Sequence, residues 1–135
     1  GDYKGIFEGN NHTVSNFTIS YSASKNDLKE NNLHISLFGS AKGAKIRNVN
    51  FTGVTVDVKT TLTATQQIYL APIAVNASGV EISNVTFNGR YTVSKLPGGR
   101  EESDILIVVN NAPFYQEDES TTQTNVSVTL TKQGE

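Results

Sequence analysis

The stretch Ile46-Arg47-Asn48-Val49-Asn50-Phe51 decides the fold, because its apolar residues cannot share one face of a straight strand. Side chains alternate between the two faces of a strand, so Ile46 would point away from Val49 and Phe51. A bend at Asn48 resets this alternation and brings all three to the same side. Asparagine readily adopts the left-handed backbone conformation that such a bend requires. We therefore predict a strand, a one-residue corner at Asn48 and a second strand.

The same pattern of apolar, any, Asn, apolar, any, apolar recurs along the chain. Full copies occupy residues 14–19 and 82–87, and a degraded copy occupies residues 125–128. A repeat of this length is typical of stacked arrays, in which each repeat forms one layer. We expect the central asparagines to lie one above another and to hydrogen-bond along the column through their amides. The alternative is four ordinary turn residues, but the matching flanks favour a ladder of Asn16, Asn48, Asn84 and Asn125.

The composition is that of a single all-β domain. The chain has 135 residues, and Val, Ile, Thr, Asn and Gly are abundant. Eleven Lys and Arg against 13 Asp and Glu give a formal net charge of −2, which gives no reason to expect nucleic acid or an anionic membrane as a partner. Cysteine is absent, which excludes disulfides and thiolate metal sites. No apolar run is long enough for membrane insertion.

Polar excursions separate the apolar segments, at residues 21–34, 57–69, 94–104 and 115–124. They leave from corresponding points of the repeat, so we expect them to cluster on one side of the stack. Insertions of this kind often form the binding face of a repeat protein. The first and last layers of such a stack expose unpaired strand edges and an apolar cross-section. We therefore expect the single domain 1–135 to be an excerpt of a longer chain, or to associate end to end with another copy.

Residues 3–19, which read YKGIFEGNNHTVSNFTI, resemble the F-x-G-T-F-D-G-N-x-H-T-I-S-N-L-T-I stretch of bacterial surface proteins with GLUG-type repeats. Ser36-Leu37-Phe38-Gly39 and residues 43–49 are similar to the G-L-F-G and G-x-x-I-x-N-L motifs of those repeats. The likeness is good over residues 3–56 and weaker over residues 71–93, where Ala71-Pro72-Ile73-Ala74 departs from the Leu-Phe-Gly pattern.

The GLUG-type family is similar to the right-handed parallel β-helices of the pectin-lyase type, in which a corner asparagine forms a ladder. The resemblance implies an all-β, right-handed parallel β-helix, a solenoid fragment of about four coils. It also implies an extracellular or cell-surface location in a bacterium.

Motifs of catalysis are missing from the sequence. His12 and His34 are the only histidines and are not spaced as zinc ligands, and no Gly-x-Ser-x-Gly is present. Polysaccharide lyases of the resembled fold use an arginine base and calcium held by clustered carboxylates, whereas the aspartates here fall in different coils or loops. We interpret Arg47, Arg90 and Arg100 as solvated strand or loop residues. The prediction is no catalytic residue, no metal and no cofactor.

Two acidic groups come from successive excursions. If they meet, their carboxylate oxygens could bind calcium or another ligand. A solvated acidic rim that aids solubility is the interpretation we favour. The residues concerned are Glu101, Glu102, Asp104, Glu117, Asp118 and Glu119.

The predicted function is that of a non-catalytic structural or adhesive segment of a secreted or cell-surface bacterial protein. Its excursions would contact a glycan or a host surface protein. One alternative is a partial domain of a pectin-lyase-type carbohydrate-active enzyme. Another is an antiparallel β-sandwich adhesion module with coincidental repeats, and strand direction separates this alternative from the β-helix.

Overall fold

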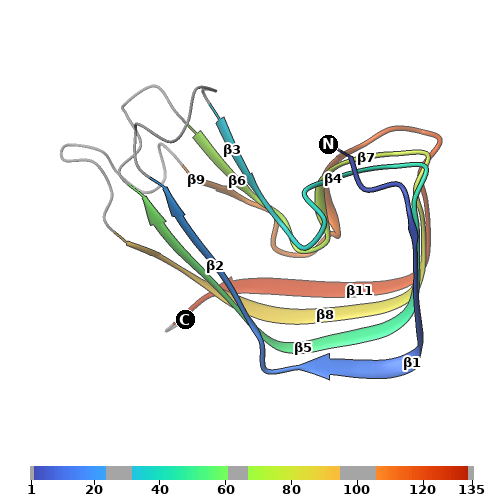
Figure 1. Cartoon of the computed structure of the whole chain (residues 1–135), viewed down its shortest axis with the longest axis horizontal. Coiled ribbons are helices and arrows are strands. Elements are labelled where there is room, and N and C mark those ends of the chain that lie inside the picture. The colour runs from blue at the N-terminus through green and yellow to red at the C-terminus, as the bar shows by residue number, and fades with distance from the viewer. Residues whose placement is uncertain (1, 24–31, 61–66, 95–105, 134–135) are drawn as a thin grey trace.

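The computed structural model describes residues 2–23, 32–60, 67–94 and 106–133 (Figure 1). Within these ranges the chain is all-β, and every pairing between named strands is parallel. This parallel pairing excludes the alternative of an antiparallel β-sandwich and agrees with a stack of repeats. The strands are β1 (Ile6–Ser15), β2 (Thr18–Ala23), β3 (Asn32–Ile35), β4 (Ser40–Lys42), β5 (Lys45–Thr60), β6 (Gln67–Leu70), β7 (Ala74–Ser78), β8 (Glu81–Ser94), β9 (Leu106–Val108), β10 (Phe114–Glu117) and β11 (Thr122–Lys132).

The strands form three sheets, and each sheet pairs equivalent strands of successive repeats. Sheet A has the order β4-β7-β10, and sheet C has the order β3-β6-β9. Sheet B has the order β1-β5-β8-β11, with β2 also paired to β5. Three repeats therefore each supply one strand to every sheet, in the order C, A, B, and β1 with β2 precede them. None of the described segments is a helix that could cross a bilayer.

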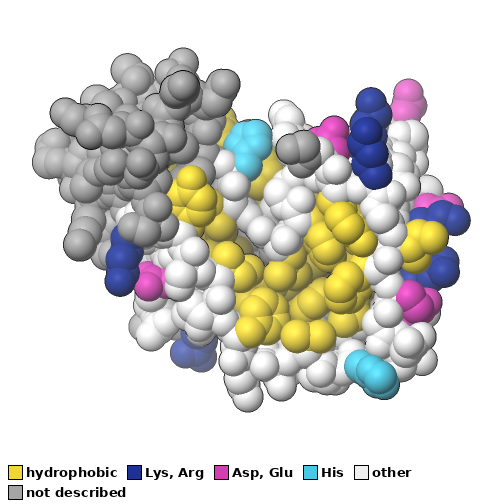
Figure 2. Space-filling view, viewed as in Figure 1, with side chains coloured by type: hydrophobic (Ala, Val, Ile, Leu, Met, Phe, Trp, Pro, Cys, Tyr) yellow, Lys and Arg dark blue, Asp and Glu magenta, His cyan; other side chains and the backbone are white. Residues whose placement is uncertain are grey.

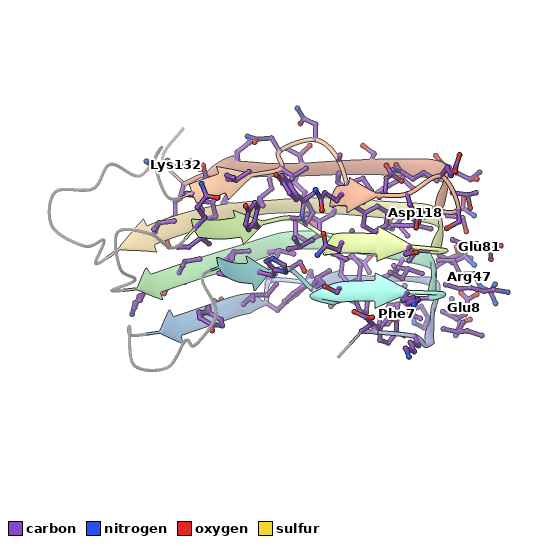
Figure 3. All side chains as sticks on the ribbon, turned by 90° about the horizontal axis from the view of Figure 1, so that it is seen from above. Phe7, Glu8, Arg47, Glu81, Asp118 and Lys132 are labelled. Carbon is purple, nitrogen blue, oxygen red and sulfur yellow. The ribbon has the colours of Figure 1, made fainter. Side chains whose placement is uncertain are left out.

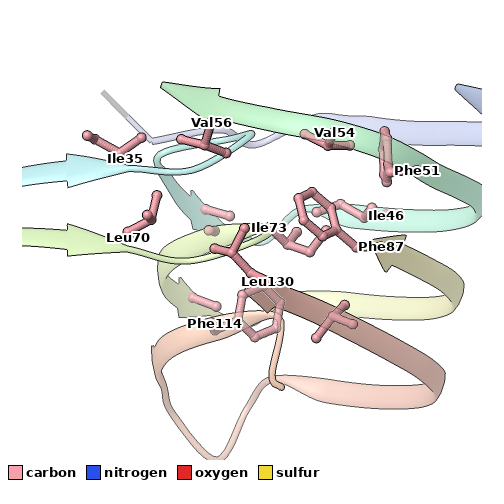
Figure 4. Packing of buried hydrophobic residues seen from close by; sticks show 14 of the residues in the cluster. Ile35, Ile46, Phe51, Val54, Val56, Leu70, Ile73, Phe87, Phe114 and Leu130 are labelled. Atoms are coloured by element: carbon pink, nitrogen blue, oxygen red, sulfur yellow. The ribbon is translucent and has the colours of Figure 1, made fainter. Parts of the chain in front are cut away.

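The predicted corner at Asn48 is confirmed. Asn48 has a φ of 58°, and the apolar residues on both sides of it are buried together, with Ile46 0%, Val49 2% and Phe51 4% exposed. Each of these side chains is paired in register with a like residue of β8, for example Phe51 with Phe87. The three sheets pack around this continuous apolar core (Figure 4).

Asn16 does not lie in the column of Asn48, so this part of the predicted ladder is wrong. Ser15 pairs with Thr52, and the N–H of Asn16 donates to the carbonyl of Thr52 at 3.0 Å. Asn16 is thus the counterpart of Gly53 at a second corner, where both residues have positive φ. A register shift between Phe51 and Val54 marks this second corner in β5.

An insertion in β1 explains why the copy of the pattern at residues 14–19 does not align with the copy at residues 46–51. Residues 9–11 lie between Glu8 and His12, which pair with Arg47 and Val49, whereas only Asn48 separates those two partners. Asn10 and Asn11 both have positive φ. Three residues therefore form the first corner in β1, where one residue is enough in β5. As a result, Asn16 lies at the second corner rather than at the first.

Three of the four predicted excursions connect equivalent points. They follow β2, β5 and β8, which pair with one another, and they precede β3, β6 and β9, which also pair. Residues 24–31, 61–66 and 95–105 themselves lie outside the described residues. The fourth segment, 115–124, was expected to cluster with them, and that expectation is wrong. It contains part of β10 and the start of β11, in register with β7 and β8, and so forms the corner between sheets A and B.

The two ends of the stack differ in how well the core is covered. Val14 in β1 is 40% exposed, whereas its column neighbours Phe51, Phe87 and Val128 are at most 6% exposed. Figure 2 shows hydrophobic side chains gathered in the middle of the face formed by β1 and β2. At the other end Leu130 is fully buried, and its N–H donates to the carbonyl of Asn110 at 2.8 Å. The end that begins with β1 is therefore the open end.

Candidate functional site: an aromatic and polar cleft

A cleft lies on the outer side of the strands where sheet C meets sheet A. Figure 1 shows the strands of the two sheets leaving the turns between them in different directions. One hollow of about 790 Å³ lies along sheet A, and a second of about 210 Å³ lies between sheets A and C. The two hollows share Asn76, Tyr115 and Gln116 as lining residues, so we treat them as one cleft.

Three aromatic rings contact one another in sequence at the cleft, two on sheet C and one on sheet A. His34 comes from β3, Tyr69 from β6 and Tyr115 from β10, so each repeat supplies one ring. The ring centres of His34 and Tyr69 are 5.5 Å apart, and those of Tyr69 and Tyr115 are 4.8 Å apart. The Tyr69 hydroxyl donates to Gln67 Oε1 at 2.9 Å. Tyr115 is 37% exposed, and its hydroxyl bonds to no residue in the described ranges.

A polar row faces the same cleft from sheet A. Ser40, Asn76 and Gln116 are in register on β4, β7 and β10, so each repeat again supplies one residue. The neighbouring residues Ala41 and Ala77 are buried and line the hollow. Ala41 and Ala77 follow the polar residues along β4 and β7, and their side chains pack in the core behind the polar row.

The polar row differs in its hydrogen bonding from two polar columns of sheet B. In those columns the side chains bond to each other across repeats, Thr86 to Asn50 at 2.7 Å and Thr92 to Asp57 at 3.0 Å. In the described part of the chain, the side chains of Ser40, Asn76 and Gln116 bond to no other residue. Amides and hydroxyls both donate and accept, so this row is available to a polar ligand.

Charged groups stand around the cleft, with carboxylates in excess. Asp2, Glu117 and Asp118 line the larger hollow together with Lys42. Hydrogen bonds from the hydroxyls of Ser120 and Ser78 lower the pKa of Asp118 to about 2. Glu117 Oε1 accepts a hydrogen bond from Gln123 Nε2 at 2.8 Å. Both carboxylates therefore have protein partners, and Asp118 is ionised at neutral pH.

Three of the predicted ladder residues form a column outside the cleft, and their amides are occupied. Asn84 Nδ2 donates to Asn48 Oδ1 at 3.0 Å, and Asn125 Nδ2 donates to Asn84 Oδ1 at 2.9 Å. Below Asn48 the column ends in Glu8, whose carboxylate oxygens lie 3.2 and 3.1 Å from Asn48 Nδ2. The column is consequently a structural element rather than a ligand site.

Glu8 was not singled out from the sequence, although it terminates the asparagine column. The backbone N–H of Asn10, the amide of Asn48 and the guanidinium of Arg47 lower the pKa of the Glu8 carboxyl. Arg47 Nε is 2.9 Å from Glu8 Oε1. Figure 3 shows Glu8, Arg47 and Glu81 at the same edge of the stack, in successive layers. The Glu8–Arg47 pair commits Arg47 to a structural contact.

The predicted acidic rim is only partly within the described residues. Glu117 and Asp118 lie at the cleft, and Glu119 is exposed in the turn that follows. Glu101, Glu102 and Asp104 lie outside the described residues, as does Arg100. In the ranges that the structure covers, no three His, Cys, Asp or Glu side chains are grouped as a metal ion would require.

Sequence reasoning missed the cleft, including its aromatic residues. His34, Tyr69 and Tyr115 all stand at an edge of a predicted excursion, next to a buried strand. One aromatic residue at an excursion boundary in each of three repeats is the signal that could have found them. Ser40, Asn76 and Gln116 carry no comparable pattern, because their common row depends on the register of sheet A.

Comparisons with protein-family models, with curated proteins and with solved structures find no match to this chain.

Proposed function

We propose that the chain is a non-catalytic, right-handed parallel β-helix segment of a secreted or cell-surface bacterial protein, and that its cleft binds a glycan. The strand-by-strand pairing of successive repeats in three sheets supports the β-helix. In that architecture the chain advances by one strand spacing, about 4.8 Å, per coil. The likeness of residues 3–56 to GLUG-type repeats supports both the right-handed coil and the surface location.

The observation that carries the glycan proposal is the pairing of an aromatic row with a free polar row in one cleft. Sugar rings present apolar C–H faces, which pack on aromatic rings, and hydroxyls, which donate and accept hydrogen bonds. The rings of Tyr69 and Tyr115 supply the first kind of contact, and the amides of Asn76 and Gln116 supply the second. Concave sites with a few convergent polar groups are the usual form of a small-molecule site.

The acidic groups of the cleft favour binding over turnover. Most glycoside hydrolases need a carboxylic acid that is still protonated near neutral pH, together with a second carboxylate. The pKa of Asp118 is lowered to about 2 by its serine partners, which makes Asp118 unsuitable as the acid. Glu117 is held by Gln123. The alternative, a partial domain of a carbohydrate-active enzyme, predicts unsaturated or reducing sugar products on incubation with polysaccharides.

A glycan array followed by calorimetry tests the binding proposal. We expect at least one glycan to bind, and we expect Tyr115→Ala and Asn76→Ala to weaken binding at least tenfold. Asn88→Ala is the matched control, because Asn88 is an exposed asparagine of sheet B that does not line the cleft. No binding across the array would overturn the proposal, as would equal losses in Asn76→Ala and Asn88→Ala. Release of sugar products would instead support the enzyme.

The uncovered end of the stack supports end-to-end self-association, with a second copy of the chain as the partner. Among the described residues, the core position of Val14 is open at the β1 end, whereas Leu130 is buried at the other end. Two copies would therefore meet through the same end and form a closed dimer rather than a filament. Sedimentation of the intact chain should show a concentration-dependent dimer that Val14→Lys removes. A monomer at all concentrations would contradict this proposal.

A further inference from the structure

We propose that the cleft selects an uncharged oligosaccharide of at least three sugar units, laid along the stacking direction, and that it discriminates against uronic acid polymers. This inference rests on the proposed glycan-binding function and specifies its ligand. It is carried by two observations, the order of the two rows and the excess of carboxylates around them.

The order of the rows gives the direction and the minimum length of the ligand. The aromatic row runs from His34 through Tyr69 to Tyr115, and the polar row runs from Ser40 through Asn76 to Gln116. In both rows the members come from three successive repeats. The polar row is in register across all three layers and therefore follows the stacking direction, with layers about 4.8 Å apart. His34 and Tyr69 are in register in sheet C, and Tyr115 stands beside Gln116 on sheet A. A sugar unit has a comparable length, so a ligand that uses both rows fully needs one unit per layer.

The charges around the cleft argue against an anionic ligand. Asp2, Glu117 and Asp118 contribute three negative charges, and Lys42 contributes one positive charge, so the lining carries 1 − 3 = −2. A polyuronate brings one carboxylate per sugar unit into this field, and like charges at short distance repel. The polar row is uncharged, and its hydroxyl and amide groups suit sugar hydroxyls. Its members are Ser40, Asn76 and Gln116.

The two tyrosines should contribute unequally to the affinity for the ligand. Tyr69 is anchored by Gln67, so its ring position is fixed before a ligand arrives. Tyr115 is more exposed and keeps its hydroxyl free for a sugar hydroxyl. A preorganised ring costs less conformational entropy on binding than a mobile one. We therefore expect the middle sugar unit, over Tyr69, to contribute most of the affinity.

The test compares matched sets of oligosaccharides on the intact chain by isothermal titration calorimetry. The neutral set contains gluco-, manno-, galacto- and N-acetylglucosamine oligomers of one to four units, and the charged set contains galacturonate, guluronate and mannuronate oligomers of the same lengths. We expect the best neutral trimer to bind at least tenfold tighter than its dimer and at least tenfold tighter than any uronate trimer. The gap between the neutral and charged trimers should narrow at high salt, because salt screens charge repulsion.

Two cleft variants separate the charge argument from general binding. Asp2→Asn and Glu117→Gln should each strengthen uronate binding severalfold and leave the binding of the neutral trimer within twofold. The side chain of Asp2 forms no hydrogen bond or ion pair with the described residues, so Asp2→Asn should not disturb folding. Lys42→Gln is the opposite control and should weaken uronate binding further.

The outcomes distinguish this inference from the proposed function. A uronate trimer that binds as tightly as the best neutral trimer overturns the ligand class and leaves glycan binding standing. A monomer that binds as tightly as the trimer overturns the extended ligand. If no oligomer of either set binds, the glycan-binding function itself fails.

Discussion

The side-chain amide of Asn84 donates to Asn48 Oδ1 at 3.0 Å, although 36 residues separate the two in the chain. Both residues have positive φ, 51° and 58°, so each stands at a left-handed corner. Asn125 continues the column above Asn84. The same residue type thus meets two needs: it tolerates the corner conformation, and it bonds the corners of neighbouring repeats to each other.

Replacing Asn84 in the middle of this column should destabilise the fold. We expect Asn84→Ala to lower the free energy of unfolding by about 1–3 kcal/mol, because it strains the corner and leaves the amides of Asn48 and Asn125 without one partner each. Chemical denaturation measures this change. Asn84→Gly separates the two causes, since glycine accepts a positive φ and removes only the amide. The control Asn88→Ala should cost less than about 0.5 kcal/mol, and an equal cost in both alanine variants would show that Asn84 is an ordinary turn residue.

Gly53 and Asn16 should be energetically coupled at the second corner. Gly53 has a φ of 63°, and a Cβ at this position would lie 2.4 Å from Asn16 Oδ1. Gly53→Ala should therefore lower the free energy of unfolding by roughly 1–3 kcal/mol through backbone strain and the clash. In an Asn16→Gly background the clash disappears and the strain stays, so the same change should cost less. A double-mutant cycle measures the difference, and a coupling energy near zero would contradict the contact.

Phe87 and Val14 occupy the same apolar column but should respond very differently to truncation. Phe87 is 3% exposed between two other layers, whereas Val14 is 40% exposed at the open end. Phe87→Ala should cost about 3–5 kcal/mol, the usual range for a buried phenylalanine. Val14→Ala should cost less than about 1 kcal/mol at low protein concentration, because little of its surface is buried in the monomer. Similar losses in both variants would indicate that the β1 end is covered in solution.

The corners were predictable from the sequence because they leave a local signature. Ile46, Val49 and Phe51 can be buried together only if Asn48 resets the alternation of the strand, and Gly53 marks the next change of parity. The all-β class and the parallel stacking follow from repetition of that signature.

The alignment between distant repeats was less predictable, because it depends on insertions that the repeated pattern itself does not reveal. The phrase around Asn16 matches the one around Asn48, yet the extra residues 9–11 shift Asn16 to the corner of Gly53. The cleft could not be predicted for the same reason, because its polar row depends on the register of the strands. Asn76 and Gln116 are 40 residues apart and share no local pattern, and only the pairing of β10 with β7 places them side by side.

The turn after β10 should make stability depend on pH in the acid range. Hydrogen bonds from Ser120 and Ser78 lower the pKa of Asp118 from 3.8 to about 2, so the folded state favours the ionised carboxylate. A carboxyl group with a lower pKa in the folded state stabilises the fold above its unfolded pKa. Its contribution is therefore complete above about pH 4 and is lost as the pH falls toward 2.

Urea denaturation of the wild type and of Asp118→Asn between pH 6 and pH 2 measures this effect. The wild type should be the more stable protein at pH 6 and pH 4, and its advantage over Asp118→Asn should shrink toward pH 2, where Asp118 becomes protonated in the folded state as well. Ser120→Ala removes one donor to the carboxylate, so the loss of stability below pH 4 should be smaller in that variant than in the wild type. A constant difference between the wild type and Asp118→Asn across this range would mean that the hydrogen bonds of Asp118 do not persist in solution.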